Sequence, residues 1–318
     1  MKVVHIGLGK TGTTSLQKSV FPRIFDNYNK KELLESLDIL LAQSFDLVKY
    51  NIFKDKFSSY KDVFISAESL VGWDPEQWSE MLNRNLAAFG KDAVILITIR
   101  DPLSYFRSYF QQIVKSGYMT NAEDYFLSEY KYRSVKKSIR PGMSDAINVD
   151  KFDLELLIKM YSDAFNKVIV VPLNNISSLN FLEELCNKDD NKLNKLTPPL
   201  QKRKNLNLSY SSVAMRLTNY KGRVLEFFGC KQNVLFFYDI KYTLNVLYKG
   251  QTPIKKNSIK SMFFKKINWH YLMILISRSP FRSNYKLPCN TYLGKNLSKN
   301  KELVRQIENS NSGFVVYE

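Results

Sequence analysis

From Lys2 to Gln17 the chain reads KVVHIGLGKTGTTSLQ. The first five of these residues are mostly β-branched and apolar and are followed at once by glycines, which is typical of a buried parallel strand entering a turn. Residues 13–20 then predict a helix that ends near Pro22. A glycine-rich loop between a strand and a helix presents backbone N–H groups to an anion. The stretch therefore predicts an α/β fold with a phosphate-binding loop.

Short apolar strands alternate with helices along the next part of the chain. The pattern predicts strands over residues 62–66, 93–99 and 168–171, and helices over residues 30–43, 75–89, 101–116, 121–130 and 151–166. Such alternation predicts one P-loop-type α/β domain of three layers, with a central parallel sheet flanked by helices. Within this single domain, residues 1–185 form the core, and residues 186–318 are a basic, aromatic-rich part expected to act as a lid or acceptor-binding region.

The 318-residue chain has a formal net charge of +17. Residues 231–318 hold 15 Lys and Arg against 4 Asp and Glu, and a basic surface attracts phosphates, acidic glycans, nucleic acid or anionic lipid. The cysteines, Cys186, Cys230 and Cys289, show neither a metal-binding nor a disulfide spacing. No targeting signal or membrane span is apparent, so we expect a cytoplasmic protein without a metal site.

The glycine-rich loop departs from an ordinary nucleotide-binding loop in the position of its lysine. Gly7 and Gly12 have the spacing of the Walker A pattern, G-x-x-x-x-G-K-[ST], but Thr13 stands where that pattern has lysine. The lysine lies inside the loop instead, at Lys10. A kinase uses the Walker lysine to reach the β- and γ-phosphates. A lysine within the loop suits a shorter ligand, one phosphate with its leaving group.

A second motif follows the strand predicted over residues 93–99. Arg100 ends that strand, so we expect it at the carboxyl edge of the sheet, where ligands bind in such folds. Ser108 comes one to two turns into the next helix, whose N-cap is predicted to be Asp101. Arginine with a hydroxyl donor makes a good phosphate clamp. Taken alone, a capped helix beside a surface arginine would give the same pattern.

Together the two motifs resemble the sulfotransferase family that uses 3′-phosphoadenosine 5′-phosphosulfate (PAPS), and its carbohydrate-type and bacterial members in particular. The resemblance implies PAPS as cofactor, no metal, and transfer of a sulfuryl group to a hydroxyl. It implies that Arg100 and Ser108 hold the 3′-phosphate, and that Arg203 and Lys204 belong to a late basic segment that folds over the cofactor. The implied residues of the 5′-phosphosulfate loop are Gly9, Lys10, Thr11, Gly12, Thr13, Thr14 and Ser15.

The resemblance also implies a glutamate or histidine base. Glu68 directly follows the strand predicted over residues 62–66, so it lies near Lys10 if that strand neighbours the first. We therefore predict Glu68 and Lys10 as catalytic residues. His5 is the competing base, although a histidine inside a strand is expected to be a hydrogen-bonded core residue. His270 falls in a region without a clear pattern.

The expected acceptor is a hydroxyl of a glycan or polysaccharide precursor, because aromatic side chains stack on sugar faces and lysines attract acidic units. Two other functions remain open at this stage. One is a P-loop nucleotide-dependent kinase, and the other is a non-catalytic protein that binds anions or nucleic acid on a nucleotide-binding fold. The sulfotransferase interpretation predicts no nucleic-acid partner and leaves peripheral contact with an anionic membrane open.

Overall fold

The computed structural model describes residues 1–41, 46–115, 121–135, 146–186, 211–227 and 285–318, together with Met273, Ile276 and Ser277. The chain forms two compact units. The first comprises Met1–Tyr105, Leu127–Leu206 and Leu293–Glu318, and the second comprises Phe106–Phe126 and Asn207–Tyr292. This division differs from the boundary expected near residue 185, because the end of the chain returns to the first unit.

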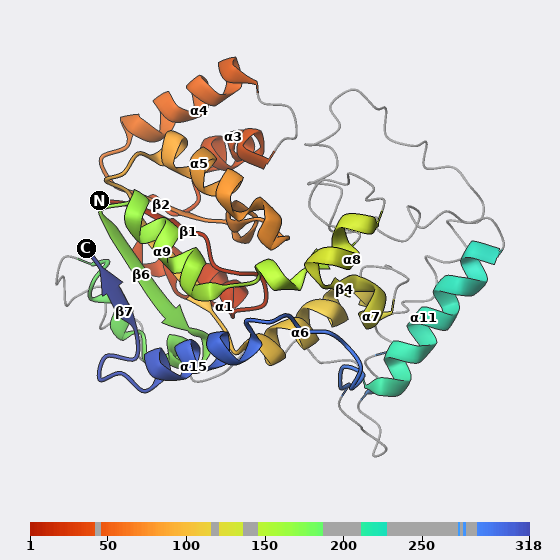
Figure 1. The fold of residues 1–318 in the computed structure, drawn as a ribbon. Helices are drawn as coiled ribbons and strands as arrows, with labels where there is room; N and C mark the ends of the chain where they lie inside the picture. The colour runs from red at the N-terminus through yellow and green to blue at the C-terminus, as the bar shows by residue number, and fades with distance from the viewer. Residues whose placement is uncertain are drawn as a thin grey trace. The chain divides into compact units, whose positions relative to one another are not determined.

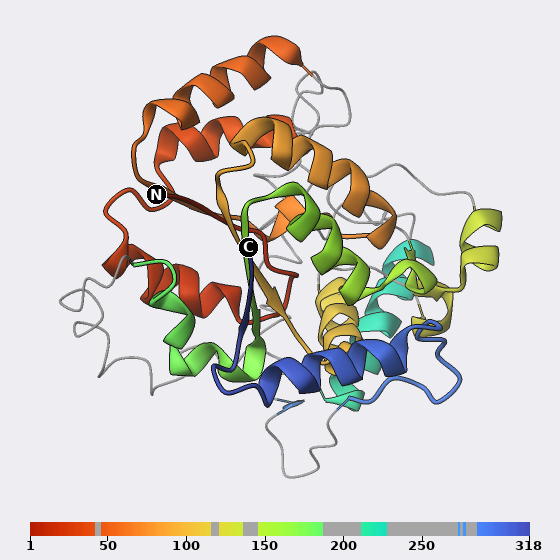
Figure 2. The ribbon, with the colours of Figure 1, turned by 60° about the vertical axis from the view of Figure 1, so that its left-hand side comes forward.

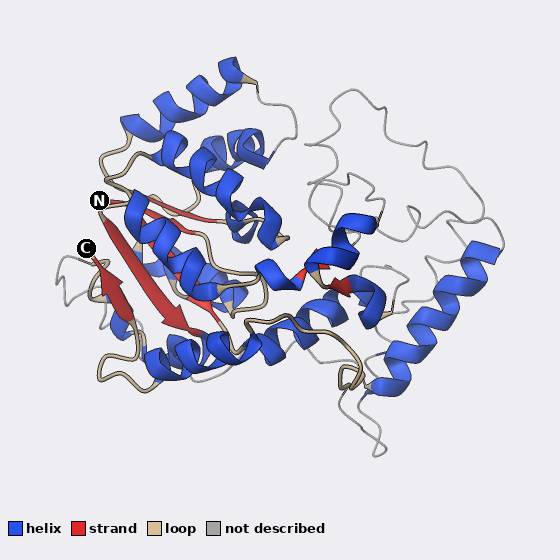
Figure 3. Ribbon diagram, viewed as in Figure 1, coloured by secondary structure: helices blue, strands red, loops and turns tan. Residues whose placement is uncertain are grey.

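The first unit contains a five-stranded sheet in the order β2-β1-β3-β6-β7 (Figures 1 and 3). Four strands are parallel, and the last pairs antiparallel with β6. The strands are β1 (Lys2–His5), β2 (Val63–Ser66), β3 (Val94–Ile99), β6 (Lys167–Pro172) and β7 (Val315–Tyr317). This confirms the expected α/β class and mostly parallel sheet. Continuous burial along β2 and β3 explains their unbroken apolar sequences.

Helices flank the sheet (Figure 2). One face packs against α1 (Thr13–Ser19), α2 (Phe21–Ile24) and two 3₁₀ turns, η4 (Leu173–Ser178) and η5 (Asn180–Leu182). On the other side lie α5 (Trp78–Phe89) and α9 (Leu154–Ala164), with α15 (Leu297–Glu308) beside α9. Outside these, α3 (Lys31–Leu41) and α4 (Leu47–Ser59) pack on α5. Members of the core include Val3, Leu16, Phe21, Phe64, Leu96, Val171 and Phe181.

The prediction of one helix over residues 121–130 is wrong. The structure has α7 (Ala122–Tyr125), the two-residue strand β4 (Phe126–Leu127) and α8 (Glu129–Ser134) there. The amide of Glu129 donates to the Asp150 carboxylate over 2.8 Å, and this bond starts α8 as a separate helix. The remaining described elements are η1 (Glu68–Val71), η2 (Pro75–Gln77), α6 (Pro102–Lys115), β5 (Ile147–Asn148), η3 (Val149–Lys151) and α11 (Ser212–Phe227). None of the described helices is long and apolar enough to cross a bilayer.

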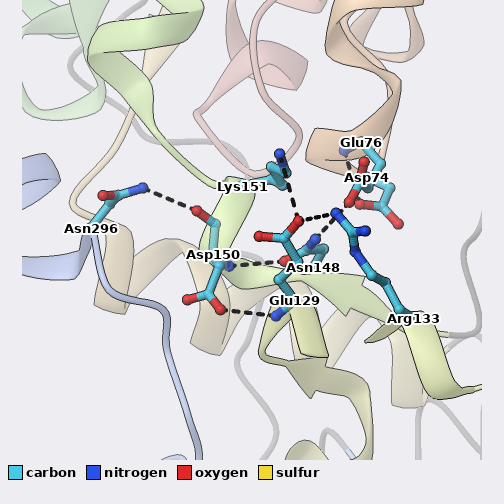
Figure 4. Close-up of polar contacts among 8 residues, drawn as sticks. All are labelled: Asp74, Glu76, Glu129, Arg133, Asn148, Asp150, Lys151 and Asn296. Carbon is cyan, nitrogen blue, oxygen red and sulfur yellow. Dashed lines mark hydrogen bonds and ion pairs between the residues drawn. The ribbon is translucent and has the colours of Figure 1, made fainter. Parts of the chain in front are cut away.

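A group of polar side chains joins η2, α8, η3 and the segment before α15 (Figure 4). The Asn148 amide donates to the Glu76 carboxylate over 2.6 Å. The side chain of Asn296 donates to the Asp150 carbonyl over 3.1 Å. Buried Asp74 caps η2, since it accepts the Glu76 amide at 3.2 Å, and it also accepts the hydroxyl of Tyr132. The carboxylates therefore serve as acceptors that fix the chain just after Trp73.

Asn300 of α15 holds the C-terminal segment against the start of α9. It is buried, accepts the Leu154 amide and donates to the Phe152 carbonyl, both at 2.8 Å. Because Asn300→Ala leaves two buried backbone groups unpaired, we expect the free energy of unfolding to fall by about 1–3 kcal/mol. Urea unfolding measures it, with the exposed neighbour substitution Lys301→Ala as control. Equal stability of the two variants would contradict this role.

Candidate active site

Three strands bring the predicted site residues to one edge of the sheet. The central strand of the three, β1, pairs with β2 on one side and β3 on the other. β1 leads into the glycine-rich loop, β2 leads to Glu68, and β3 leads to Arg100. Because all three are parallel, their carboxyl ends lie together. Glu68 was expected near Lys10 if its strand paired with the first strand. Since β2 pairs with β1, this condition is met.

The loop between β1 and α1 has an unusual backbone. Lys10 has φ 69° and Gly12 has φ 80°, both in the left-handed region. That conformation costs a residue with a side chain about 1–2 kcal/mol, so Lys10 is held there by its surroundings. Within the described part of the chain, the amides of Gly9, Lys10, Gly12, Thr13 and Thr14 donate to no protein acceptor. The loop thus offers several N–H groups to a ligand, as an anion-binding loop does.

Two hydrogen bonds hold this loop from within. The hydroxyl of Thr11 is fully buried and lies 2.5 Å from the Leu8 carbonyl and 2.7 Å from the Thr98 hydroxyl. Thr11 therefore supports the loop rather than offering its hydroxyl to a phosphate. Of the other hydroxyl residues predicted here, Thr13 is buried at the start of α1, and Thr14 and Ser15 are half-buried.

Arg100 contacts the loop directly. Its Nη1 donates to the Lys10 carbonyl over 3.0 Å, and its Nε donates to the Ser104 hydroxyl over 3.1 Å. The Asp101 carboxylate accepts the Ser104 amide at 2.8 Å, which confirms its predicted capping role. Arg100 therefore fixes the backbone at Lys10, and its hydroxyl partner is Ser104. Ser108 lies one turn farther along α6, and the role of Arg100 and Ser108 at a 3′-phosphate stays a prediction.

Glu68 and Trp73 both lie against Gly9. A methyl group placed on Gly9 would come within 3.0 Å of Trp73 Cζ3 and 3.5 Å of Glu68 Oε2. A side chain at this position would crowd the Trp73 ring and would be in ordinary contact with Glu68. Trp73 was not predicted from the sequence as a site residue. Its position directly before the turn at Asp74 and Pro75 was the one feature that could have indicated it. An aromatic ring and a carboxyl group thus meet beside the glycine-rich loop.

Burial shifts the charges of this site toward neutrality. It raises the pKa of Glu68 to about 7, against an opposing effect of the Lys10 ammonium. It also lowers the pKa of Lys10, with Glu68 opposing and Arg100 adding to the shift. A carboxyl with a pKa near 7 can accept or release a proton at neutral pH. The site therefore combines a loop with exposed N–H donors, a lysine and a carboxyl whose pKa is suited to general base catalysis.

His5 occupies a different environment. Its Nδ1 lies 2.7 Å from the Ser66 hydroxyl and its Nε2 lies 3.2 Å from the Thr98 hydroxyl. The ring is almost fully buried, and burial lowers its pKa to about 3. Both nitrogens are engaged in links between strands, as expected for a core histidine. Glu68 is therefore the better placed of the two predicted bases.

Three of the residues considered in the sequence cannot be placed in this site. Arg203, Lys204 and His270 lie outside the described residues. Among the residues that are described, no group of three or more His, Cys, Asp or Glu side chains could hold a metal ion. Comparison of the chain with protein-family models, with curated proteins and with solved structures found no match. A function therefore has to be argued from the geometry of the site.

The pKa of Glu68 predicts a pH dependence of stability. An unfolded glutamate has a pKa of about 4.3, so between that value and about 7 the folded state binds a proton that the unfolded state has lost. Glu68 therefore makes the free energy of unfolding fall as the pH rises through this range, by at most about 1.4 kcal/mol per pH unit. In the Glu68→Gln variant, this contribution to the fall in the free energy of unfolding should be absent.

Urea unfolding of the wild type and of Glu68→Gln between pH 4 and pH 8 would measure this pH dependence of the free energy of unfolding. The pH range follows from the two pKa values of about 4.3 and about 7. The difference between the wild type and Glu68→Gln should change across the range and level off above it. Parallel pH profiles of the two proteins would show that the carboxyl titrates normally.

Proposed function

We propose that this chain is a PAPS-dependent O-sulfotransferase with a P-loop-type α/β fold, and that it transfers a sulfuryl group to a hydroxyl of a carbohydrate. One observation carries the proposal. A loop with an internal lysine and several backbone amides that donate to no acceptor among the described residues lies beside a half-buried carboxyl whose pKa is near 7. Group transfer from a phosphate anion to a hydroxyl needs this pair of functions.

The anion side of the site is provided by the loop. The amides of Gly9, Lys10, Gly12, Thr13 and Thr14 can donate to a 5′-phosphate, and Lys10 adds a positive charge in a poorly hydrated position. Bonds from the Arg100 guanidinium and the Thr11 hydroxyl keep the loop in its strained form. The loop is therefore preorganised for an anion, and binding requires little rearrangement.

The acceptor side is provided by Glu68 and Trp73. Glu68 would take the proton of the attacking hydroxyl. Trp73 is half-buried beside it, and tryptophan offers a large flat apolar surface with little conformational entropy to lose. A pyranose ring has an apolar face that can lie on such a surface while its hydroxyls point outward. This pairing supports a carbohydrate acceptor.

PAPS, when bound, supplies an electrophilic sulfur on a 5′-phosphate leaving group. Transfer would form a bond between the acceptor oxygen and sulfur and break the bond from sulfur to the phosphate oxygen, with the electron pair leaving on the phosphate. Glu68 retains the acceptor proton, and Lys10 balances charge that develops on the leaving oxygen. The protein residues thus account for proton and charge without a redox step.

The cofactor assignment predicts a selective ligand response. Adenosine 3′,5′-bisphosphate without Mg²⁺ should raise the unfolding temperature, because the loop lacks the lysine that a Mg²⁺-nucleotide site uses. Stabilisation at one hundred times Kd is about 2.7 kcal/mol. Thermal unfolding with the bisphosphate, adenosine 5′-monophosphate and ATP with Mg²⁺ compares the ligands. A response to ATP with Mg²⁺ alone would favour a kinase and reject this proposal.

Substitutions at Glu68 and Lys10 should separate proton transfer from anion binding. Glu68→Gln should lower kcat by about 10²–10⁴ while keeping bisphosphate affinity, because glutamine has nearly the same shape but accepts no proton. Lys10→Ala should lose turnover and also weaken bisphosphate binding by about 1.5–3 kcal/mol. Isothermal titration gives the affinity, and sulfate transfer to glycan acceptors gives the rate.

Matched controls lie on exposed helix surfaces. Glu35→Gln in α3 and Lys18→Ala in α1 repeat the two changes of charge at exposed positions, and neither should alter rate or affinity. Transfer by Glu68→Gln at the wild-type rate would place the base elsewhere. Unchanged bisphosphate affinity in Lys10→Ala would remove the lysine from the anion site.

A further inference from the structure

The positive charge of the protein is concentrated in the second unit. Residues 106–126 and 207–292 contain 16 Lys and Arg against 4 Asp and Glu, a net charge of +12 out of +17 for the whole chain. The first unit, although larger, carries the remaining +5. An imbalance of this size in one unit indicates an anionic partner.

One of the helices of this unit, α11, has an exposed apolar stripe. Val213, Leu217 and Tyr220 are 49%, 37% and 69% exposed and recur at the spacing of one helix face. Exposed Arg216 lies on the same side. The opposite side is buried through Ala214 and Met215. The helix is therefore amphipathic with an outer face that is apolar and basic, where a water-facing helix would be polar.

The first turn of α11 is well fixed. The Ser211 hydroxyl accepts the amide of Ala214 over 3.2 Å and so caps the helix. The Ser211 amide donates to the buried hydroxyl of Ser277 over 2.9 Å, and that hydroxyl donates to the Met273 carbonyl over 2.7 Å. These bonds set which residues of α11 face outward.

We propose that this outer face of α11, formed by Val213, Arg216, Leu217 and Tyr220, binds the surface of an anionic phospholipid membrane. An interfacial helix places aliphatic and aromatic side chains at the boundary of headgroups and acyl chains, and basic residues near lipid phosphates. A Lys or Arg near an anionic surface contributes about 1 kcal/mol, which Arg216 on this face can provide. The net charge of +12 makes the second unit electrostatically suited to such a surface. The proposal is independent of the sulfotransferase assignment.

The aliphatic side chains favour lipid over nucleic acid as the anionic partner. A nucleic acid would satisfy the lysines and arginines through phosphate contacts. It would give little to Val213 and Leu217, whose exposed surfaces gain most by leaving water for an apolar phase. A lipid surface satisfies both the charge and the apolar stripe.

Vesicle sedimentation tests this proposal on the full chain. The protein should sediment with phosphatidylcholine vesicles that contain phosphatidylserine, more weakly as salt is raised, and should stay in solution with pure phosphatidylcholine. Replacing Val213, Leu217 and Tyr220 together by serine should weaken vesicle binding by at least about tenfold. These side chains are exposed, so the unfolding temperature should stay close to that of the wild type.

The first unit offers a matched control. Leu47, Val48 and Ile52 of α4 are 61%, 69% and 46% exposed, and their triple replacement by serine should leave vesicle binding unchanged. Wild-type vesicle binding by the α11 variant, or equal loss in the α4 variant, would overturn the proposal. Retention on duplex DNA at the salt concentration that releases the protein from vesicles would assign the charge to nucleic acid and also overturn it.

Discussion

The candidate site depends on a buried polar link among three strands and the loop. The Thr98 hydroxyl lies 2.7 Å from the Thr11 hydroxyl and 3.2 Å from His5, whose other nitrogen lies 2.7 Å from the hydroxyl of Ser66. Each of these side chains is buried, so each must keep its partner or incur the cost of an unsatisfied polar group. The relative positions of β1, β2, β3 and the loop are thereby fixed together, at the edge where ligands bind.

The same burial that strengthens this link sets the chemistry beside it. Where water is excluded, charged forms are disfavoured, and so the pKa of Glu68 rises and that of Lys10 falls. The loop also holds Lys10 in a left-handed conformation, which the Arg100 guanidinium stabilises at the Lys10 carbonyl. The strained backbone at Lys10 is held by hydrogen bonds from Arg100 and Thr11 and by the buried links to the sheet. A more flexible loop would relax the strain at Lys10 and would let water reach Glu68. The pKa of Glu68 would then return toward its usual value.

Local pattern predicted the parts of the site that lie close to a strand end. The first strand, its loop, and the positions of Glu68 and Arg100 followed from apolar runs that stop at polar residues. The contact between Trp73 and Gly9 and the choice of Ser104 as the partner of Arg100 did not, since they depend on how turns fold back in space. The return of β7 to β6 was missed for a similar reason. Three residues carry too weak a pattern to predict a pairing with a strand so distant in sequence.

The site and the net charge of the protein have separate physical origins. In the proposed site, backbone amides would provide most of the attraction for an anion, and they add no net charge. The Glu68 carboxyl offsets part of the positive charge of Lys10. A site built in this way does not need a strongly basic protein around it. The first unit indeed carries only +5, while the smaller second unit carries +12. The membrane surface proposed for α11 would account for the excess charge of the second unit.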